Sequence, residues 1–167
     1  MLVAFPPIAR ADARLLILGS MPGEASLAAT QYYAHPRNAF WSIMGELCGA
    51  APALPYAERI ERLKDAGIAV WDVLAQCERQ GSLDTAISPD TAEPNDFATF
   101  FAAHPAIGHV FFNGSFAETC FRRRIWTAAL RPGLTMQRLP STSPAHAGRS
   151  LAQKQAIWRD ALAPLLR

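Results

Sequence analysis

Four short apolar runs along the chain predict the strands of one sheet. They cover residues 14–19, 68–73, 107–112 and 134–139. The first run is continuously apolar and ends at Gly19, a pattern typical of a buried parallel strand that leads into a turn. The other runs end beside Asp72, Asn113 and Pro140. We therefore expect four buried strands, each closed by a short polar or turn-forming segment.

Between these runs the apolar residues recur at helical spacing. Phe40, Ile43, Met44 and Leu47 share one face of a predicted helix that stops at Gly49. Further helices are predicted over residues 56–66, 95–104, 115–129 and 151–166, the second capped by Asn95. Strands and helices thus alternate. Right-handed crossovers turn this order into a three-layer αβα domain of the α/β class, with a central four-stranded, mainly parallel sheet. Residues 80–93 fit neither pattern and are expected on the surface.

Size and composition favour one domain that covers residues 1–167. Half of the 167 residues are hydrophobic, which suffices for a proper core. The apolar stretches are far shorter than the roughly 20 residues that span a bilayer, and the first residues do not resemble a secretory signal. We expect a cytoplasmic protein without a membrane segment, and a monomer, because no pattern indicates an oligomer.

The remaining composition excludes several kinds of site. Cys48, Cys77 and Cys120 are odd in number and lie in apolar surroundings, so buried free thiols are expected rather than disulfides. No metal-ligand spacing occurs, and we expect neither a metal nor a cofactor. The formal net charge of +2 permits nucleic-acid binding without requiring it.

The candidate chemistry gathers at the ends of the predicted strands. Ligands of open α/β sheets bind at the carboxyl ends of the strands. The segments that leave these ends are Gly19-Ser-Met-Pro-Gly23 (the first loop), Asp72, Asn113-Gly-Ser115, and Ser141-Thr-Ser-Pro-Ala-His146 (the second loop). The aromatic segment 32–41, which contains Ala34-His-Pro-Arg-Asn-Ala-Phe-Trp41, follows the first loop.

These segments resemble the motifs of a known family. The first loop and the Ala34–Trp41 segment match, in order and spacing, the GxNPG loop and AHPxNxFW segment of the mismatch-specific uracil-DNA glycosylases. The second loop takes the place of the superfamily's HPSP or NPSG motif, which enters the DNA minor groove. The chain is therefore similar to the uracil-DNA glycosylase superfamily. This resemblance implies a monofunctional enzyme that flips a damaged base out of DNA and hydrolyses its N-glycosidic bond.

Two departures from the family pattern indicate a particular branch of the superfamily. Met21 stands where most members have the Asp or Asn that positions the attacking water, and Ser141 stands where the second motif begins with His or Asn. The pattern instead resembles the hypoxanthine-DNA (deoxyinosine) glycosylase branch, whose principal catalytic residue is the asparagine of the HPRN segment. The implied catalytic residue is Asn38, and the implied substrate is DNA, double- or single-stranded, that contains deaminated adenine.

The resemblance also assigns roles to the other residues. Asn38 orients the water and supports the cationic sugar, while Asn113 donates to the base or to the water. Tyr33 forms the stacking face of the base pocket, and Asp72 reads the base. The remaining base-binding candidates are Gly19, Ser20, Met21, Pro22 and Phe40. The DNA-binding candidates are Ser141, Thr142, Ser143, Pro144, Ala145, His146 and Arg149.

Each of these roles has a simpler structural alternative. Asn38 also suits a helix cap, Asn113 and Asp72 suit turns, and Phe40 suits the core beneath the next helix. Glu24 either replaces the missing first-loop carboxylate or compensates a helix dipole.

Three other functions compete with this interpretation. The chain could be a uracil- or mismatch-specific glycosylase of the same fold, or a non-catalytic DNA-binding relative in which Met21 marks lost activity. A phosphate-binding hydrolase is disfavoured, because the first loop has no lysine and only two glycines.

Overall fold

A four-stranded parallel sheet forms the centre of the computed structural model, which describes residues 1–167. The strands lie in the order β3 (Ile68–Asp72), β2 (Leu15–Gly19), β6 (His109–Asn113) and β7 (Thr135–Leu139). Every neighbouring pair is parallel. The predicted sheet is confirmed, and the strands end within a residue of the predicted positions.

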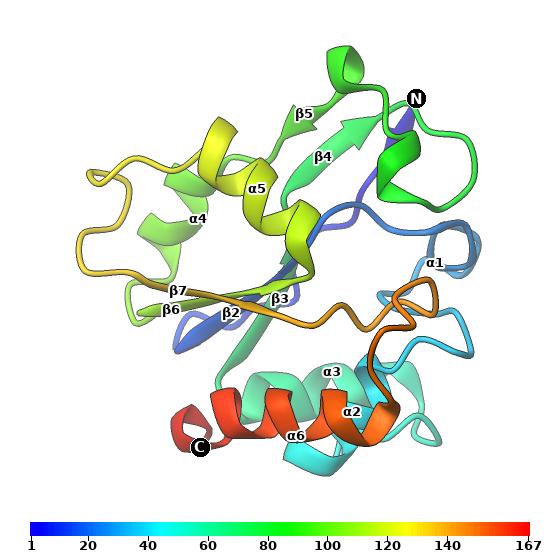
Figure 1. Ribbon diagram of the computed structural model, residues 1–167. Coiled ribbons are helices and arrows are strands. Elements are labelled where there is room, and N and C mark those ends of the chain that lie inside the picture. The colour runs from blue at the N-terminus through cyan, green and yellow to red at the C-terminus, as the bar shows by residue number, and fades with distance from the viewer.

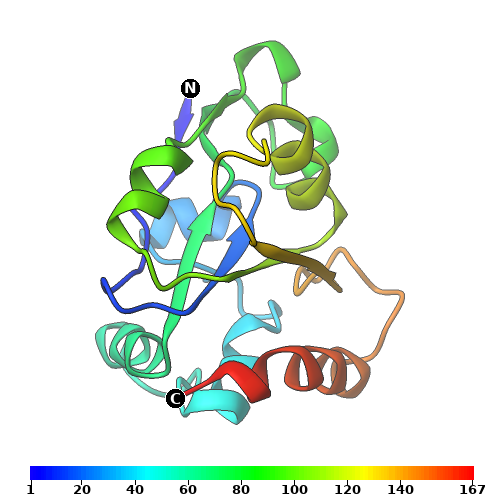
Figure 2. The same ribbon diagram turned by 90° about the vertical axis from the view of Figure 1, so that its left-hand side faces the viewer.

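Helices cover both faces of this sheet (Figure 1, Figure 2). Side chains alternate between the two faces of a strand, so Leu15 and Ile17 of β2 enter one core cluster and Leu16 and Leu18 the other. The first cluster packs against α2 (Phe40–Cys48), α3 (Tyr56–Asp65) and α6 (Leu151–Leu162). The second packs against α4 (Phe97–Ala103) and α5 (Ser115–Arg124). The expected three-layer αβα arrangement is confirmed.

A second, smaller sheet was not predicted. It contains the antiparallel strands β1 (Leu2–Val3), β4 (Leu74–Cys77) and β5 (Glu93–Pro94). Two of these strands have two residues each, too few to produce a sequence pattern. Between β4 and β5 the chain forms two 3-10 turns, η1 (Asp84–Ala86) and η2 (Pro89–Thr91). Most of this stretch is exposed as expected, but Ile87 and Ala92 enter the core.

Helix ends differ from the predictions for local reasons. The helix α5 stops at Arg124 because Ile125 has left helical geometry, with φ at −125°. The cap of α4 is Asp96, whose carboxylate accepts from the Thr99 amide at 3.1 Å. The expected cap, Asn95, instead donates from its side-chain amide to the Asp72 carbonyl at 2.8 Å.

Three further features complete the fold. A short helix that was not predicted, α1 (Glu24–Ala29), follows the first loop. The helix α6 passes into the 3-10 turn η3 (Ala163–Leu165) at a proline. No helix of the protein has the length and apolarity needed to cross a membrane. The three cysteines are free, two of them buried and Cys48 partly exposed.

Candidate active site

The parallel sheet brings the predicted segments to one edge. The strands β2, β3, β6 and β7 end at Gly19, Asp72, Asn113 and Leu139, respectively, and parallel strands end at the same side of a sheet. Hydrogen bonds tie the loops that follow to one another. The structure therefore gathers candidates that lie more than a hundred residues apart in the chain.

The first loop is held firmly and is partly apolar. The carbonyl oxygen of Gly19 accepts a hydrogen bond from the Val73 amide at 2.8 Å, and that of Ser20 accepts one from the Leu74 amide at 3.1 Å. The Met21 side chain is 7% exposed and belongs to the core cluster that packs against α4 and α5. Pro22 is also buried. Met21 thus offers no polar atom that would position a water molecule, as its chemistry predicts.

Tyr33 lies at the centre of the site and is supported by Phe40. Its backbone is left-handed, with φ at 53°, an uncommon conformation for a residue with a side chain. Its ring stacks on Phe40 with 4.1 Å between centroids and 27° between planes. Phe40 is fully buried and also contacts Trp41 and Trp158. Phe40 therefore packs in the core, which agrees with its structural alternative and not with a contact to the base, and the stacking role of Tyr33 stays a prediction.

The tip of Tyr33 meets Asp72 beside the last residue of β2. A Cβ atom at Gly19 would lie 2.9 Å from Tyr33 Oη and 2.5 Å from Asp72 Oδ1, so only glycine fits there. Tyr33 Oη and Asp72 Oδ2 are both buried without a hydrogen-bond partner. Unpaired buried polar atoms are rare and unfavourable. Two of them at one place indicate a site that a polar ligand completes.

Burial changes the protonation of both groups. The pKa of Asp72 is raised to about 7, chiefly by burial and also by the Asp84 charge, against the opposing charge of Arg79. Burial also raises the pKa of Tyr33 above its usual value, with added repulsion from Asp72, while the nearby Asn113 amide lowers it. Tyr33 is thus a hydroxyl donor at neutral pH, and Asp72 changes between its acid and carboxylate forms near neutrality.

Asn38 lies at the start of α2, next to the Tyr33–Phe40 stack. Its Oδ1 accepts from the Phe40 amide at 3.0 Å, and its own backbone amide donates to the His35 carbonyl at 2.9 Å. The N-cap of α2 is Ala39 without a side-chain cap, so the helix-capping alternative is wrong, and the Asn38 side chain instead closes a turn that leads into the helix. A carbonyl oxygen has a second lone pair, and the side-chain nitrogen has two hydrogens. The bond to Phe40 thus leaves Asn38 able to contact a ligand as well.

Asn113 makes a two-point contact with the second loop. Its Nδ2 donates to Thr142 Oγ1 at 3.0 Å, and its Oδ1 accepts from the Thr142 amide at 2.9 Å. The Thr142 carbonyl in turn accepts from the Ala39 amide at 3.0 Å. Thr142 is 1% exposed, so its predicted contact with DNA was wrong; it joins the second loop to the Asn38 segment. The catalytic role of Asn113 stays a prediction beside this positioning role.

The outer part of the second loop faces solvent. Ala145, His146 and Arg149 are exposed, and Ser141, Ser143 and Pro144 are partly exposed. The base of the loop is fixed by Lys154 of α6, which is buried and donates from Nζ to the His146 carbonyl at 2.7 Å. The sequence pointed to no role for Lys154, because lysine is normally a surface residue.

Two residues from the stretch between β4 and β5 also reach the site. Ser20 Oγ donates to Asp84 Oδ1 at 2.5 Å, and Arg79 Nη2 donates to the Pro22 carbonyl at 2.6 Å. Sequence reasoning placed residues 80–93 on the surface and missed both contacts. The length of this stretch was a usable signal, because long irregular stretches in compact domains are often functional. Glu24 is exposed in the first turn of α1, which agrees with its dipole role.

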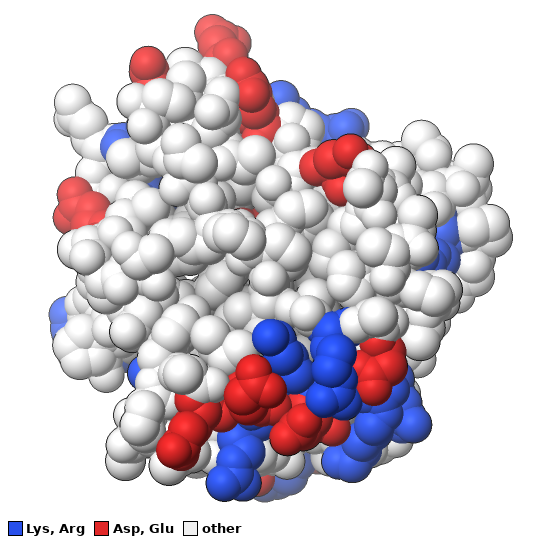
Figure 3. Space-filling view, turned by 180° about the vertical axis from the view of Figure 1, so that it is seen from behind, with Lys and Arg blue, Asp and Glu red and all other residues white.

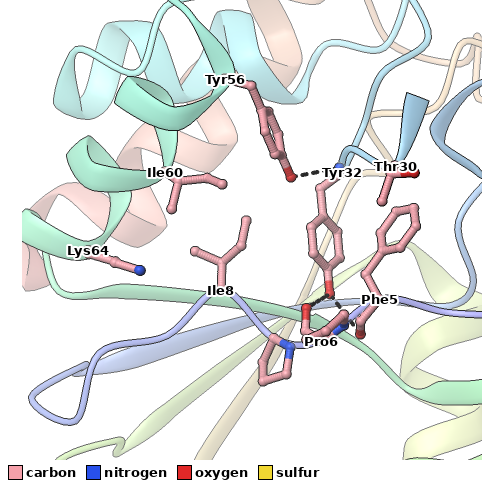
Figure 4. A pocket seen from close by; sticks show the side chains of 9 residues that line it. Phe5, Pro6, Ile8, Thr30, Tyr32, Tyr56, Ile60 and Lys64 are labelled. Carbon is pink, nitrogen blue, oxygen red and sulfur yellow. Dashed lines mark hydrogen bonds between the residues drawn. The ribbon is translucent and has the colours of Figure 1, made fainter.

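A hollow of about 250 Å³ lies outside the candidate site, between the N-terminal segment, Tyr32 and α3 (Figure 4). Its lining includes Phe5, Ile8, Tyr56 and Lys64, and none of the predicted site residues belongs to it. The Tyr32 hydroxyl donates to the Pro6 carbonyl at 2.8 Å, so this side chain is bound to the N-terminal segment that also lines the hollow.

Charges on the back of the molecule are mixed in sign (Figure 3). Basic and acidic residues of α3 alternate along the helix, and several pair with each other or with their neighbours. Arg10, for example, contacts both Asp12 and Asp65, at 2.7 and 2.9 Å. This face is therefore a solvated surface and offers no basic patch for a phosphate backbone.

Comparison with known proteins assigns the family. The family model described as "Uracil DNA glycosylase superfamily" matches residues 6–162, and the chain belongs to this family. A hypoxanthine DNA glycosylase of Methanosarcina barkeri is 35% identical over 94% of this chain and 95% of its own length. One of Methanosarcina acetivorans is 34% identical over 66% and 69%. The solution NMR structure of a candidate uracil DNA glycosylase from Methanosarcina acetivorans superposes with a TM-score of 0.77, at 28% identity over 98% of this chain and 97% of that one.

Proposed function

We propose that this protein removes hypoxanthine from DNA by flipping the nucleotide out and hydrolysing its N-glycosidic bond. The observation that carries the proposal is the pair of unpartnered buried atoms, Tyr33 Oη and Asp72 Oδ2, at the carboxyl edge of the sheet. The relatives named hypoxanthine DNA glycosylase support the same substrate.

The two unpartnered atoms match the polar edge of hypoxanthine. This base presents an O6 acceptor and an N1–H donor, whereas adenine presents a donor and an acceptor at these positions. The Tyr33 hydroxyl donates to O6 at the edge of the base, in place of the ring stacking that the resemblance implies, and a carboxyl oxygen of Asp72 accepts from N1–H. Adenine would set its N1 against the carboxylate form of Asp72, and because the Tyr33 hydroxyl can also accept from an amino group, the discrimination depends on Asp72. Leaving such buried groups unpaired discriminates strongly between bases.

Catalysis then depends on fixed dipoles around the bond that breaks. The sugar becomes positively charged and the departing purine negatively charged, so preorganised neutral groups stabilise the transition state. Asn38 lies beside the stacked ring of Tyr33 and presents its side-chain amide to the sugar and the water. Asn113 keeps the second loop in place through Thr142.

The second loop supplies the contact with the DNA strand. Its exposed residues, Ala145 and His146, enter the minor groove and fill the space that the flipped nucleotide leaves, while Arg149 contacts a phosphate. Every residue of this site comes from one chain. We therefore infer that a monomer acts on the DNA.

Single-turnover excision tests the proposal. Duplexes that contain hypoxanthine or uracil are incubated with the wild-type protein, Asn38→Ala and Asn38→Ser. Serine can make the same side-chain bond to the backbone two residues on, although more weakly, but lacks the amide. If the amide acts in catalysis, both variants lose about a hundredfold in rate on hypoxanthine, the cost typical of one key electrostatic donor.

The same experiment separates the alternatives. A purely structural role in the turn before α2 predicts that Asn38→Ser keeps most of the wild-type rate. Activity on uracil and none on hypoxanthine would assign the protein to a uracil-specific branch. Binding of both duplexes without excision would show a DNA-binding relative, and each of these three results overturns the proposal.

A further inference from the structure

The segment 79–84, which we call the strap, is bound to the first loop and the start of α1 at three points. Arg79 Nη2 donates to the Pro22 carbonyl at 2.6 Å, and the Glu24 amide donates to Ser82 Oγ at 2.9 Å. Asp84 accepts from the Ser20 hydroxyl at 2.5 Å. Two of these contacts involve backbone groups of the first loop and α1. The third contact joins the Asp84 carboxylate to the hydroxyl of Ser20 in the first loop.

The Ser20–Asp84 pair lies in the same electrostatic environment as the base-reading groups. Asp84 is only partly exposed, and its charge raises the pKa of both Asp72 and Tyr33. Burial raises the pKa of Asp84 itself, while the bond from Ser20 and the charge of Arg79 oppose this shift. A partly buried carboxylate held against the first loop is therefore within electrostatic reach of the reacting groups.

The chemistry of the site can use such a group. Hydrolysis consumes a water molecule, which must lose a proton, and an amide such as that of Asn38 cannot accept one at neutral pH. The first loop contains no carboxylate, because Met21 fills the relevant position with an apolar side chain. Glu24 is exposed in α1, whereas Asp84 is bonded to the loop itself.

We propose that Asp84 is the base of this site and acts through the Ser20 hydroxyl, an inference that rests on the proposed function. The water oxygen bonds to C1′ while the C1′–N9 bond breaks, and the electron pair of that bond leaves with the purine. The water proton passes to Ser20 Oγ as the Ser20 hydroxyl proton passes to Asp84. Asp84 then returns its proton to solvent, and the purine anion takes one from solvent. Asp84 is thus a positioning and proton-accepting residue that acts through Ser20.

Three variants separate this role from simple attachment of the strap. Asp84→Asn keeps the size of the side chain but removes its basicity, and Ser20→Ala removes the hydroxyl between Asp84 and the water. Ser82→Ala is the matched control, because it removes another strap contact on an exposed residue without changing the Ser20–Asp84 pair. The double variant, with both Ser20→Ala and Asp84→Asn, completes a double-mutant cycle.

The measurements are the single-turnover excision rate at saturating enzyme, the affinity for a hypoxanthine duplex made uncleavable by 2′-fluorination, and the melting temperature. We expect Asp84→Asn and Ser20→Ala each to lower the rate about a hundredfold, within the range of general-base contributions. The double variant should lose no more than either single variant. Affinity should change by less than about threefold, under the value of one hydrogen bond, and Ser82→Ala should keep the wild-type rate.

Several results would overturn the inference. Equal losses in Ser82→Ala and Asp84→Asn would show that the strap is only structural, as would losses confined to affinity. A wild-type rate in Asp84→Asn would exclude the base role while leaving the proposed function intact. A wild-type protein inactive on hypoxanthine would instead refute the proposed function. If Asp84→Asn melts below the assay temperature, the rate of Ser20→Ala decides the question, because this variant removes only one partly exposed hydroxyl of the relay.

Discussion

Substitution of Gly19 by alanine tests the geometry on which the site depends. Gly19 is the last residue of β2, and it pairs with Asp72 across the parallel sheet. An added methyl group would meet Asp72 Oδ1 at 2.5 Å and Tyr33 Oη at 2.9 Å, and ordinary contact begins at 3.4 Å. The carboxylate must therefore retreat by about 0.9 Å and the hydroxyl by about 0.5 Å.

The expected cost follows from this displacement. Asp72 is 3% exposed and the Tyr33 ring is stacked on a fully buried Phe40, so neither side chain can move without disturbing its neighbours. Overpacking of this kind destabilises a protein by about 1–3 kcal/mol. A misplacement near 1 Å at a reacting centre lowers the rate about a hundredfold. We expect Gly19→Ala to show both losses.

Urea unfolding and single-turnover excision of hypoxanthine measure these effects. Gly108→Ala is the matched control, because nothing lies within 4 Å of its added methyl group and its backbone needs no glycine. This control should stay within about 0.5 kcal/mol of the wild type or gain slightly from a less flexible unfolded chain. If Gly19→Ala matches Gly108→Ala in both stability and rate, the placement of Asp72 and Tyr33 at this point is refuted.

Two further predictions concern buried charges. The pKa of Asp72 is about 7 in the fold against an ordinary 3.8, so the folded protein holds the extra proton and wild-type stability falls as pH rises from about 4 to 7. Asp72→Asn lacks this pH-dependent contribution, so its free energy of unfolding should rise by roughly 2–4 kcal/mol relative to that of the wild type between pH 5 and pH 8. Urea unfolding of both proteins at the two pH values measures this difference. An equal pH dependence of stability in the two proteins would contradict the prediction. Lys154→Met keeps the apolar stem but loses the bond to the His146 carbonyl, so affinity for an uncleavable hypoxanthine duplex should fall about fivefold, near the value of one hydrogen bond. Unchanged affinity in fluorescence anisotropy would show that Lys154 does not fix the second loop.

The sequence by itself determined the architecture and the edge where the site lies. Continuous apolar runs such as Leu15–Gly19 are a local signal, because burial on both faces of a sheet requires apolar residues at every position. The strand ends and the helices that follow them are local as well. The residue types at those ends, with their spacing, were enough to indicate the family.

Only the tertiary structure decided which side chains meet. Ser20 and Asp84 are 64 residues apart, and Asn113 and Thr142 are 29 apart, so no local pattern links either pair. The second contact also shows why a threonine in a predicted DNA-binding loop is buried. Such bonds form where packing brings two loops within about 3 Å of each other, and that distance depends on the whole core beneath them. Hydrophobic periodicity specifies the layers, while the hydrogen bonds between loops are a consequence of how the layers pack.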